Sequence, residues 1–529
     1  MADLHLDDKR VESSTEVAGV FDDRVSHVAQ KYQGTDADRQ EMAMLGKKQV
    51  LRRNFNFLTM LGFASTCICS WEGIFTYLNF VLIDGGTPLL FWGFIACALC
   101  QTLVYASLAE MASMSPTAGG QYHWVSEFSP PRWQKVLSYY SGWLTAIGWQ
   151  VYLASVCFLV GTTIQGLIAL NNPDYSYARW HGTLLAIAIV VFTIVFNTSL
   201  ASRLPFIEVV ALIVHVGGFI AIIATLWAMA PRRSASVALL DFTNLGGWNS
   251  TGLSAMIGLL APMAVLVGYD CSVHMSEEIQ DASITLPRAI MGSVVLNVTL
   301  VFTVIVTICF TLGDANEILE SPTGYAFIQM FYNATQSYAG ASVMVAIVIV
   351  MLAICAVSEA AASSRQIWSF ARDAGLPGSK WLSRVSPRWN IPLPAIALSL
   401  VISALLSLIN IGSSVALNAI TSLGAVATLL SYYLTIGCLV HRRVKGPALP
   451  MRRWSLGRFG LAVNVGALVL LTPLIFFLTW PLTTPVTAEG MNWSSVMLAG
   501  VFIIATVYYV VKGRHEYAGP VVHIRREVD

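Results

Sequence analysis

The stretch Leu61-Gly-Phe-Ala-Ser-Thr-Cys-Ile-Cys-Ser-Trp-Glu-Gly73 places glycine and small polar residues inside an apolar run that covers residues 55–83. A helix that crosses a bilayer needs about 20 apolar residues, which this run supplies. A second apolar run is interrupted in the same way, by Gly258-Leu-Leu-Ala-Pro262 and by Gly268-Tyr-Asp-Cys-Ser272. The proline removes a backbone donor, and the glycine lowers the cost of non-helical geometry. These patterns predict two membrane-spanning helices that are broken along their length.

The rest of the chain continues the membrane pattern. Of 529 residues, 56% are hydrophobic and only 12% are charged, whereas soluble domains carry about 25% charged residues. We predict an all-α integral membrane protein with twelve spans. They cover residues 55–83, 89–110, 137–170, 181–200, 206–229, 253–275, 289–312, 340–364, 393–411, 415–440, 459–480 and 494–511.

Composition and motifs exclude several classes of protein. The 31 basic and 30 acidic residues nearly cancel, which excludes a nucleic-acid binder held by clustered positive charge. All nine cysteines fall in apolar runs, and Cys97-x-x-Cys100 has no second pair or nearby histidine, so we expect no metal site and no other cofactor. The internal loops carry no phosphate-binding glycine loop and no hydrolase motif. We therefore expect neither an ATP-driven pump nor an enzyme, but a carrier driven by a gradient.

The basic residues predict the orientation in the membrane. Three of them (Arg179, Arg232 and Arg233) fall in loops after odd-numbered spans, whereas fifteen fall in loops after even-numbered spans. Because cytoplasmic loops carry the excess of lysine and arginine, both polar tails, residues 1–54 and 512–529, are predicted to be cytoplasmic. The first tail lacks the apolar region of a signal peptide. The plasma membrane is the expected location, with a vacuolar membrane as the alternative.

The spacing of the spans indicates an internal duplication. Spans one to five occupy residues 55–229 and spans six to ten occupy 253–440, which together form the expected transport core. Because five is odd, a repeat of the first half would enter the membrane with inverted topology, as in many secondary transporters whose first repeat helices are broken. The two extra spans, residues 459–511, would pack outside this core.

Broken helices favour a substrate that carries opposite charges. Exposed backbone N–H groups attract a carboxylate, and exposed carbonyl groups attract a cation or an ammonium group. The expected substrate is thus a small amine or amino acid. Acids inside the spans favour a proton over sodium as the coupling ion.

Four stretches resemble signatures of the amino acid–polyamine–organocation permeases, and their combination resembles the fungal branch that carries amino acids, GABA or choline. They are Ser107–Trp124, Gly268–Ala282 followed by Leu286-Pro-Arg-Ala-Ile290, Ser364–Pro377, and Asn418-Ala-Ile-Thr-Ser-Leu423. The resemblance implies a five-plus-five inverted repeat and symport or exchange by alternating access. A transporter of a specialised metabolite and a non-transporting nutrient sensor are the alternatives, although the short tails argue against a sensor.

Candidate site residues cluster at the two breaks. Glu72 and Asp270 are acids inside spans, where they bind an ammonium group, carry the proton, or are held by a neighbouring helix or a helix end. His274 lies about one helical turn beyond Asp270 and could share its proton. The rings of Trp71 and Tyr269 could face a cation or simply pack. The full substrate-binding set is Ser70, Trp71, Glu72, Gly73, Gly268, Tyr269 and Asp270.

Other polar residues are assigned to the ends of the spans. Glu110, Glu277 and Glu278 lie near the cytoplasmic ends, close to Arg203, Arg288 and Arg365. We expect a cytoplasmic gate or structural ion pairs formed by Glu110, Glu277, Glu278 and Arg365. Asn333 and Asn492 are candidate glycosylation acceptors in predicted outside loops. Glu359 lies six residues before Arg365, on the wrong face for a pair, and receives no role.

Overall fold

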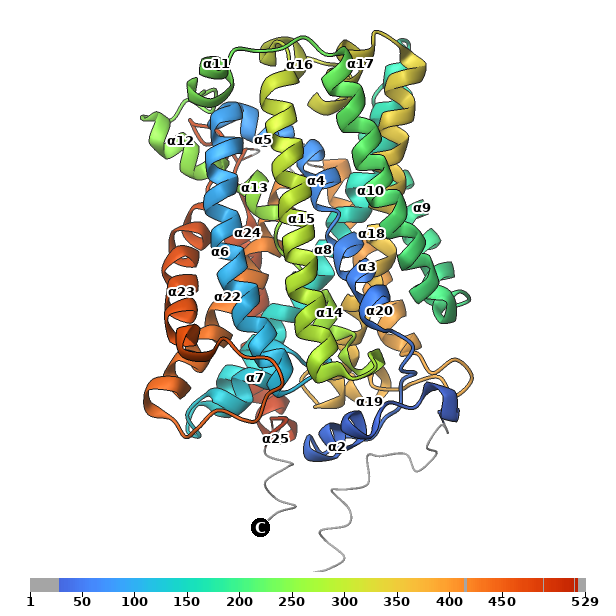
Figure 1. The fold of residues 1–529 in the computed structure, drawn as a ribbon, viewed down its shortest axis with the longest axis vertical. Helices are drawn as coiled ribbons and strands as arrows, with labels where there is room; N and C mark the ends of the chain where they lie inside the picture. The colour runs from blue at the N-terminus through green and yellow to red at the C-terminus, as the bar shows by residue number, and fades with distance from the viewer. Residues whose placement is uncertain (1–27, 413–415, 489, 518, 522–529) are drawn as a thin grey trace, which may run out of the picture.

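The computed structural model describes residues 28–412, 416–488, 490–517 and 519–521, and it confirms an all-α multi-pass architecture (Figure 1). In these residues eleven segments are long and apolar enough to cross a membrane. The first is built from α3, α4 and α5, and α20 is extended by α21. The bundle helices are α3 (Phe57–Ile68), α4 (Ser70–Thr76), α5 (Leu78–Ile83), α6 (Gly86–Met114), α8 (Gln134–Asn171), α9 (Arg179–Asn197), α10 (Leu204–Met229), α15 (Ala282–Thr311), α18 (Tyr338–Arg372), α20 (Leu393–Ser407), α21 (Ile409–Gly412), α22 (Ala416–Lys445), α23 (Gly460–Phe477) and α24 (Ser494–Tyr508).

Shorter helices connect the bundle. They are α2 (Asp36–Met44), α7 (Gln121–Phe128), α11 (Ala235–Leu240), α12 (Thr251–Gly258), α13 (Leu260–Ala264), α14 (Cys271–His274), α16 (Ala315–Leu319), α17 (Ala326–Thr335), α19 (Ser379–Leu382) and α25 (Arg514–Glu516). In Figure 1, α2, α7, α19 and α25 lie at one end of the bundle, and α11, α16 and α17 lie at the other. The first and last described α-helices, α2 and α25, therefore share one end, which we call the α2 end.

The sixth predicted span, residues 253–275, is not one of the eleven long segments. It folds as α12, α13 and α14, and residues 265–270 between α13 and α14 are not helical. Gly268 lies there at φ 117, a conformation that residues with a Cβ rarely adopt. Its N–H donates to Tyr105 Oη at 2.8 Å, which satisfies a backbone donor that the break frees. This interruption falls inside the sequence stretch that predicted it.

The first span is interrupted at Cys69, which has φ 44 and separates α3 from α4, and again at Tyr77, between α4 and α5. Cys69 Sγ lies 3.0 Å from Thr66 O and 3.1 Å from Met351 O, so its thiol ties the break to α18. The interruption at Cys69 and that of the sixth span lie against each other, because a Cβ on Gly268 would lie 3.0 Å from Ile68 Cδ1. The structure thus brings both breaks to one place, while the inverted repeat itself stays a prediction.

The long helix α8 lies inside the bundle and packs against α9, α18 and α22, while α6 packs against α15. In the most apolar stretch of Phe57–Ile83, 78% of residues are buried, against 17% in Ser494–Glu516. The broken first span therefore lies at the centre of the bundle and α24 lies at its edge.

Candidate functional site

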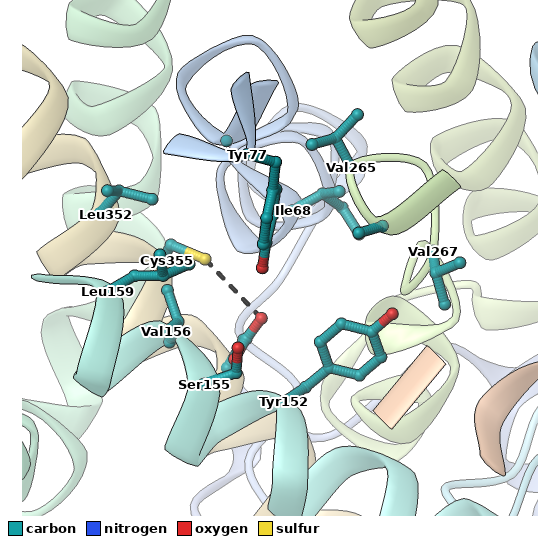
Figure 2. A pocket seen from close by; sticks show the side chains of 13 residues that line it. Ile68, Tyr77, Tyr152, Ser155, Val156, Leu159, Val265, Val267, Leu352 and Cys355 are labelled. Carbon is teal, nitrogen blue, oxygen red and sulfur yellow. Dashed lines mark hydrogen bonds between the residues drawn. The ribbon is translucent and has the colours of Figure 1, made fainter. Parts of the chain in front are cut away.

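A cavity lies where the two broken helices meet α8 and α18 (Figure 2). The cavity has a volume of about 40 Å³. Its walls come from all four elements: Ile68, Gly73 and Tyr77; Ala264, Val265 and Val267; Tyr152, Ser155, Val156 and Leu159; Leu352, Cys355 and Glu359. The cavity lies between spans one and six, where the sequence predicts the substrate site. Of the predicted binding residues, Gly73 lines it and the other six do not.

Glu359 of α18 is the one acid in the lining of this cavity. Its side chain is 7% exposed. Oε1 lies 3.8 Å from Cys355 Sγ, and Oε2 has no hydrogen-bond partner in the described part of the chain. Sequence alone assigned Glu359 no role, because its spacing from Arg365 does not allow the two to pair on an ideal helix. The missed signal is the acid itself, since a carboxyl group inside an apolar span marks a functional site by default.

Polar groups from α8 also line the cavity. Tyr152 Oη is buried and has no hydrogen-bond partner among the described residues. Ser155 Oγ lies 3.0 Å from Thr421 Oγ1 of α22. In Figure 2 the side chains of Tyr77, Tyr152 and Ser155 surround the cavity. The polar part of the cavity is therefore made of hydroxyl groups and one carboxyl group.

Glu72 lies just outside the cavity, in a buried network with α10 and α15. Its Oε1 is 2.7 Å from His215 Nδ1, and all four side chains of the network (Glu72, Trp71, His215 and Asn297) are fully buried or nearly so. Trp71 Nε1 donates to the same His215 nitrogen at 3.1 Å. His215 Nε2 lies 3.3 Å from Asn297 Oδ1. The structure therefore places Trp71 and Glu72 against α10, and His215 is a partner that the sequence analysis missed.

Asp270 is the acceptor in a second buried network. Gln121 Nε2 donates to its Oδ2 at 2.6 Å and Trp149 Nε1 donates at 3.2 Å. Tyr432 Oη donates to Oδ1, and His274 Nε2 lies 3.4 Å from Oδ2. The side chain makes no cap hydrogen bond to α14. Asp270 therefore ties the second break to α7, α8 and α22.

Ser70 and Tyr269 join the two breaks directly. Ser70 Oγ lies 3.3 Å from Tyr269 Oη, and both residues are fully buried. The Tyr269 ring packs edge-on against Tyr105, with ring centroids 4.9 Å apart. These two predicted site residues lie together between α4 and α6, behind the cavity wall.

Glu208 is a further buried acid that the sequence analysis did not single out. Thr66 Oγ1 of α3 donates to its Oε2 at 2.6 Å, and Ser358 Oγ of α18 donates to its Oε1 at 2.7 Å. Both carboxyl oxygens of Glu208 therefore have partners, and the residue connects α10 to the first span and to α18.

Ion pairs close the α2 end of the bundle beneath the second break. Arg372 donates to both oxygens of Glu277 at 2.8 and 2.9 Å, and Arg365 Nε donates to Glu278 at 2.8 Å. Burial alone would raise the pKa of Glu277, but Arg372 lowers it to about 2. The predicted gate residues Glu277, Glu278 and Arg365 thus lie together.

Glu110 lies apart from these pairs and has other partners than the sequence suggested. It pairs with Arg443 in the last turn of α22, and at 3.1 Å with Arg452 in the segment between α22 and α23. The predicted neighbours Arg203 and Arg288 make no ion pair with it in the described residues. Glu110 therefore attaches the end of α6 to the segment between α22 and α23.

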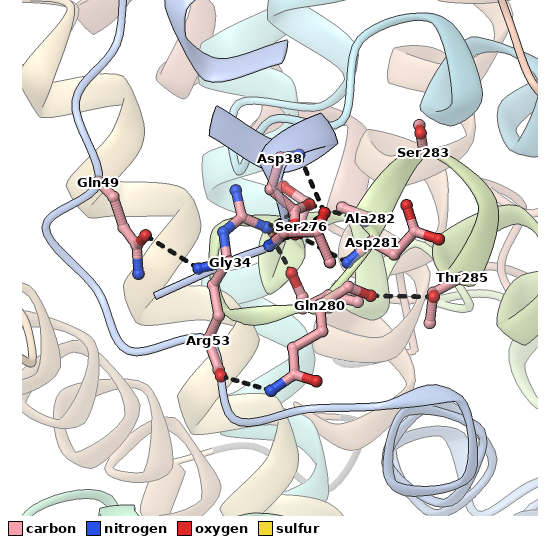
Figure 3. Close-up of polar contacts among 12 residues, drawn as sticks. Gly34, Asp38, Gln49, Arg53, Ser276, Gln280, Asp281, Ala282, Ser283 and Thr285 are labelled. Atoms are coloured by element: carbon pink, nitrogen blue, oxygen red, sulfur yellow. Dashed lines mark hydrogen bonds and ion pairs between the residues drawn. The ribbon is translucent and has the colours of Figure 1, made fainter. Parts of the chain in front are cut away.

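The polar segment before α3 packs against the α2 end of the bundle (Figure 3). Asp38 accepts the N–H groups of Asp281 and Ala282 at 2.9 and 3.0 Å and pairs with Arg53 at 3.1 Å. Burial alone would raise the pKa of Asp38, but Arg53 and these N–H groups lower it. Asp38 thereby satisfies the first N–H groups of α15.

The two glycosylation candidates differ in environment. Asn333 lies in α17, and its Nδ2 donates to Glu317 at 3.1 Å on the exterior. Asn492 is fully buried, and its Nδ2 donates to Ser422, Leu478 O and Trp480 O. A glycan at Asn492 would require this packing to open, so the structure favours Asn333 of the two.

Comparisons with known proteins show the family of this chain. The sequence profile of the amino acid permease family matches residues 55–503. A Macrophomina phaseolina protein provisionally named an amino acid/polyamine transporter is 33% identical over 82% of this chain and 97% of its own length. The choline transporter of Saccharomyces cerevisiae is 29% identical over 88% of this chain and 83% of its own. The amino-acid permease BAT1 of Arabidopsis thaliana is 28% identical over 92% and 97%. The chain belongs to the amino acid permease family, within the amino acid–polyamine–organocation permeases.

Proposed function

We propose that the protein is a secondary active transporter of a small amine-bearing solute, such as an amino acid, GABA or a choline-like compound, and that the solute binds in the cavity between the broken helices. The observation that carries this proposal is the position of the cavity: it lies at both helix interruptions and is lined by an acid, Glu359, whose Oε2 has no hydrogen-bond partner among the described residues. The names of the relatives, which include a choline transporter and amino-acid permeases, support the substrate class.

Alternating access would open the cavity to each side in turn. In the present conformation the α2 end is closed by the pairs Glu277–Arg372 and Glu278–Arg365. It is also closed by Asp38 of α2, which accepts a hydrogen bond from the first N–H group of α15. These pairs, with Glu110, form the proposed cytoplasmic gate. Because buried ion pairs must separate before solvent can enter between their helices, they set a barrier to opening on that side.

Proton coupling is proposed at Glu72, with His215 as its partner. Asn297 Nδ2 donates to Ser65 O at 3.2 Å, so its Oδ1 is free to accept the hydrogen of His215 Nε2. Trp71 Nε1 and Glu72 Oε1 both lie within hydrogen-bond distance of His215 Nδ1. Glu72, 2.7 Å from this nitrogen, bonds to it either as an acid that donates its proton or as a carboxylate that accepts the Nδ1 hydrogen. In both forms one proton lies between Glu72 and His215, as a proton carrier requires; Asp270 and His274 are the other proposed carriers.

Uptake of a labelled panel tests the proposed function. In a yeast host that lacks its own permeases, we expect concentrative uptake of at least one of GABA, choline, lysine, proline and putrescine. Uptake should fall when a protonophore removes the proton gradient, because the gradient supplies the free energy. The empty host provides the control. Failure to accumulate any of the five compounds, with the protein present at the cell surface, would contradict the proposal.

Orientation is tested separately. We propose that both tails face the cytoplasm, because the arginine-rich segments 365–388 and 442–458 follow even-numbered spans and α2 and α25 share one end of the bundle. Epitope tags placed at residue 20 and residue 520 should both stay inaccessible to antibody in intact cells and become accessible after permeabilisation. Exposure of one tag alone would mean an odd number of crossings and would contradict the topology.

A further inference from the structure

Among the buried acids near the broken helices, Glu359 alone both lines the cavity and has an oxygen without a hydrogen-bond partner in the described residues. Glu208 and Asp270 use both carboxyl oxygens in hydrogen bonds. Glu72 also has an unpartnered oxygen, Oε2, but its other oxygen bonds to His215 of α10 and the residue does not line the cavity. Glu359 has one weak contact, a thiol at 3.8 Å, and an unpartnered Oε2. The capacity of its carboxylate to accept hydrogen bonds is therefore available to a ligand.

Glu359 also lacks a counter-charge. Within the described part of the chain no lysine, arginine or histidine nitrogen lies within 4 Å of it, and Arg365, one and a half turns further along α18, pairs with Glu278 instead. Removing an ionised carboxylate from water without a partner costs several kcal/mol. A cation that enters the cavity would offset this cost, because it restores both charge balance and hydrogen bonding.

The rest of the lining determines which cation fits. Aliphatic side chains and the rings of Tyr77 and Tyr152 form most of the wall, and the lining contains no lysine, arginine or histidine. Such walls suit methylene groups, and the unpartnered Tyr152 Oη adds a second acceptor for an N–H group. A carboxylate on the solute would find no basic side chain in this lining.

We propose that Glu359 binds the ammonium group of the transported solute, and that the cavity prefers small amines that carry no carboxylate over zwitterionic amino acids. This inference rests on the proposed transport function and deepens it. Glu359 is the specificity-determining residue of the site, whereas Glu72 and Asp270 act in networks outside the cavity wall.

Competition by three small compounds of matched chain length tests the inference. Purified protein is reconstituted in liposomes loaded with unlabelled amine, and exchange of the labelled panel amine that the wild type transports is measured against n-butylamine, GABA and 1-butanol. Exchange is used because it does not require net proton movement. We expect butylamine to inhibit the wild type more strongly than GABA, and butanol to inhibit least. In Glu359→Gln the inhibition constant of butylamine should rise about 10- to 100-fold, the worth of one hydrogen bond to a charged group, while that of butanol stays unchanged.

Two further variants calibrate the result. Glu359→Asp keeps the charge and should retain the order of the three inhibitors. Glu320→Gln removes an exposed acid from the loop before α17 and should behave as the wild type. Equal butylamine inhibition in Glu359→Gln and wild type would overturn the role of Glu359 while leaving amine transport intact. A wild type that exchanges none of the panel amines would instead overturn the proposed function, and this inference with it.

If Glu359→Gln does not fold, a labelling experiment on the wild type tests whether Glu359 binds the amine. Dicyclohexylcarbodiimide labels membrane-buried carboxyl groups, and mass spectrometry locates the adduct. N,N-Dimethylbutylamine, a tertiary amine that cannot form an amide with the activated carboxyl group, should reduce labelling of Glu359, whereas butanol should not, and labelling of Glu208 is the internal control. Unchanged labelling of Glu359 at amine concentrations that fully inhibit exchange would overturn the inference.

Discussion

Replacing Glu72 with glutamine is expected to abolish concentrative uptake while leaving exchange intact. The glutamine amide can donate to His215 Nδ1 as the protonated acid does, so the buried network of Trp71, His215 and Asn297 keeps its hydrogen bonds. The amide cannot release a proton, however. The loaded carrier can still return in exchange, but an empty carrier cannot reset by losing its proton, and coupling fails.

The measurement uses liposomes with the membrane potential clamped at zero and a pH difference of one unit. A proton crossing such a gradient releases about 1.4 kcal/mol, which supports roughly tenfold accumulation at one proton per solute. The wild type should approach this ratio and Glu72→Gln should stay near one. Glu320→Gln again serves as the exposed control. Tenfold accumulation by Glu72→Gln would show that the proton is carried elsewhere.

Asp270→Asn is expected to behave differently from Glu72→Gln. Asp270 accepts hydrogen bonds from Gln121, Trp149 and Tyr432, so three donors face its carboxylate. An asparagine would turn an amide group toward some of these donors and leave buried groups unsatisfied. Loss of folded protein, rather than loss of coupling alone, is the physical consequence of changing this residue.

The spans were predictable because long apolar runs have few other solutions in a membrane. The helix ends agree to within a few residues at most positions; for example, the predicted span 459–480 is found at Gly457–Phe477. The sixth span was predicted as an apolar run with breaking residues, and its division into α12, α13 and α14 follows from them. Composition and local periodicity contain this information.

The glycines of the first span were expected to break the helix, but in the structure they allow neighbouring elements to pack closely. The chain breaks at Cys69, not at a glycine. A Cβ on Gly62 would lie 2.8 Å from Glu208 O, and one on Gly73 would lie 3.0 Å from Val265 Cγ1. These glycines permit close packing against α10 and against the second break. A lone sequence does not distinguish a glycine that bends the backbone from one that admits a neighbour.

Local sequence predicted which acids lie at the two breaks, but not which residues surround them. Glu72 and Asp270 stood out because they lie at the breaks, but their partners His215, Gln121 and Tyr432 come from helices far along the chain. Glu359 was judged only against Arg365 of its own helix, which pairs with Glu278 instead. Its place in the cavity depends on α3, α8 and α13 meeting at α18, which only the three-dimensional packing shows.

Breaking the Glu277–Arg372 pair at the proposed gate is expected to lower stability strongly. Arg372→Gln leaves the Glu277 carboxylate, which is 2% exposed, without its charge partner, a loss of about 3–5 kcal/mol for a buried pair. Glu277→Gln should cost less, because Arg372 is 14% exposed. The double variant should recover most of the loss, since it leaves no unpaired charge. Thermal unfolding in detergent measures all three.

The exposed pair Arg453–Asp281, whose side chains are 45% and 35% exposed, is the matched control, and Arg453→Gln should cost less than about 1 kcal/mol of stability.

The pH dependence of stability adds an independent check. Because Arg372 lowers the pKa of Glu277 from 4.5 to about 2, this stabilisation is complete above pH 4.5 and is lost as pH falls through 2. The stability gap between wild type and Glu277→Gln should therefore be full at neutral pH and narrower at about pH 3. A gap that widens on acidification, or a double variant no more stable than Arg372→Gln, would mean that the two side chains do not stabilise the closed end as a pair.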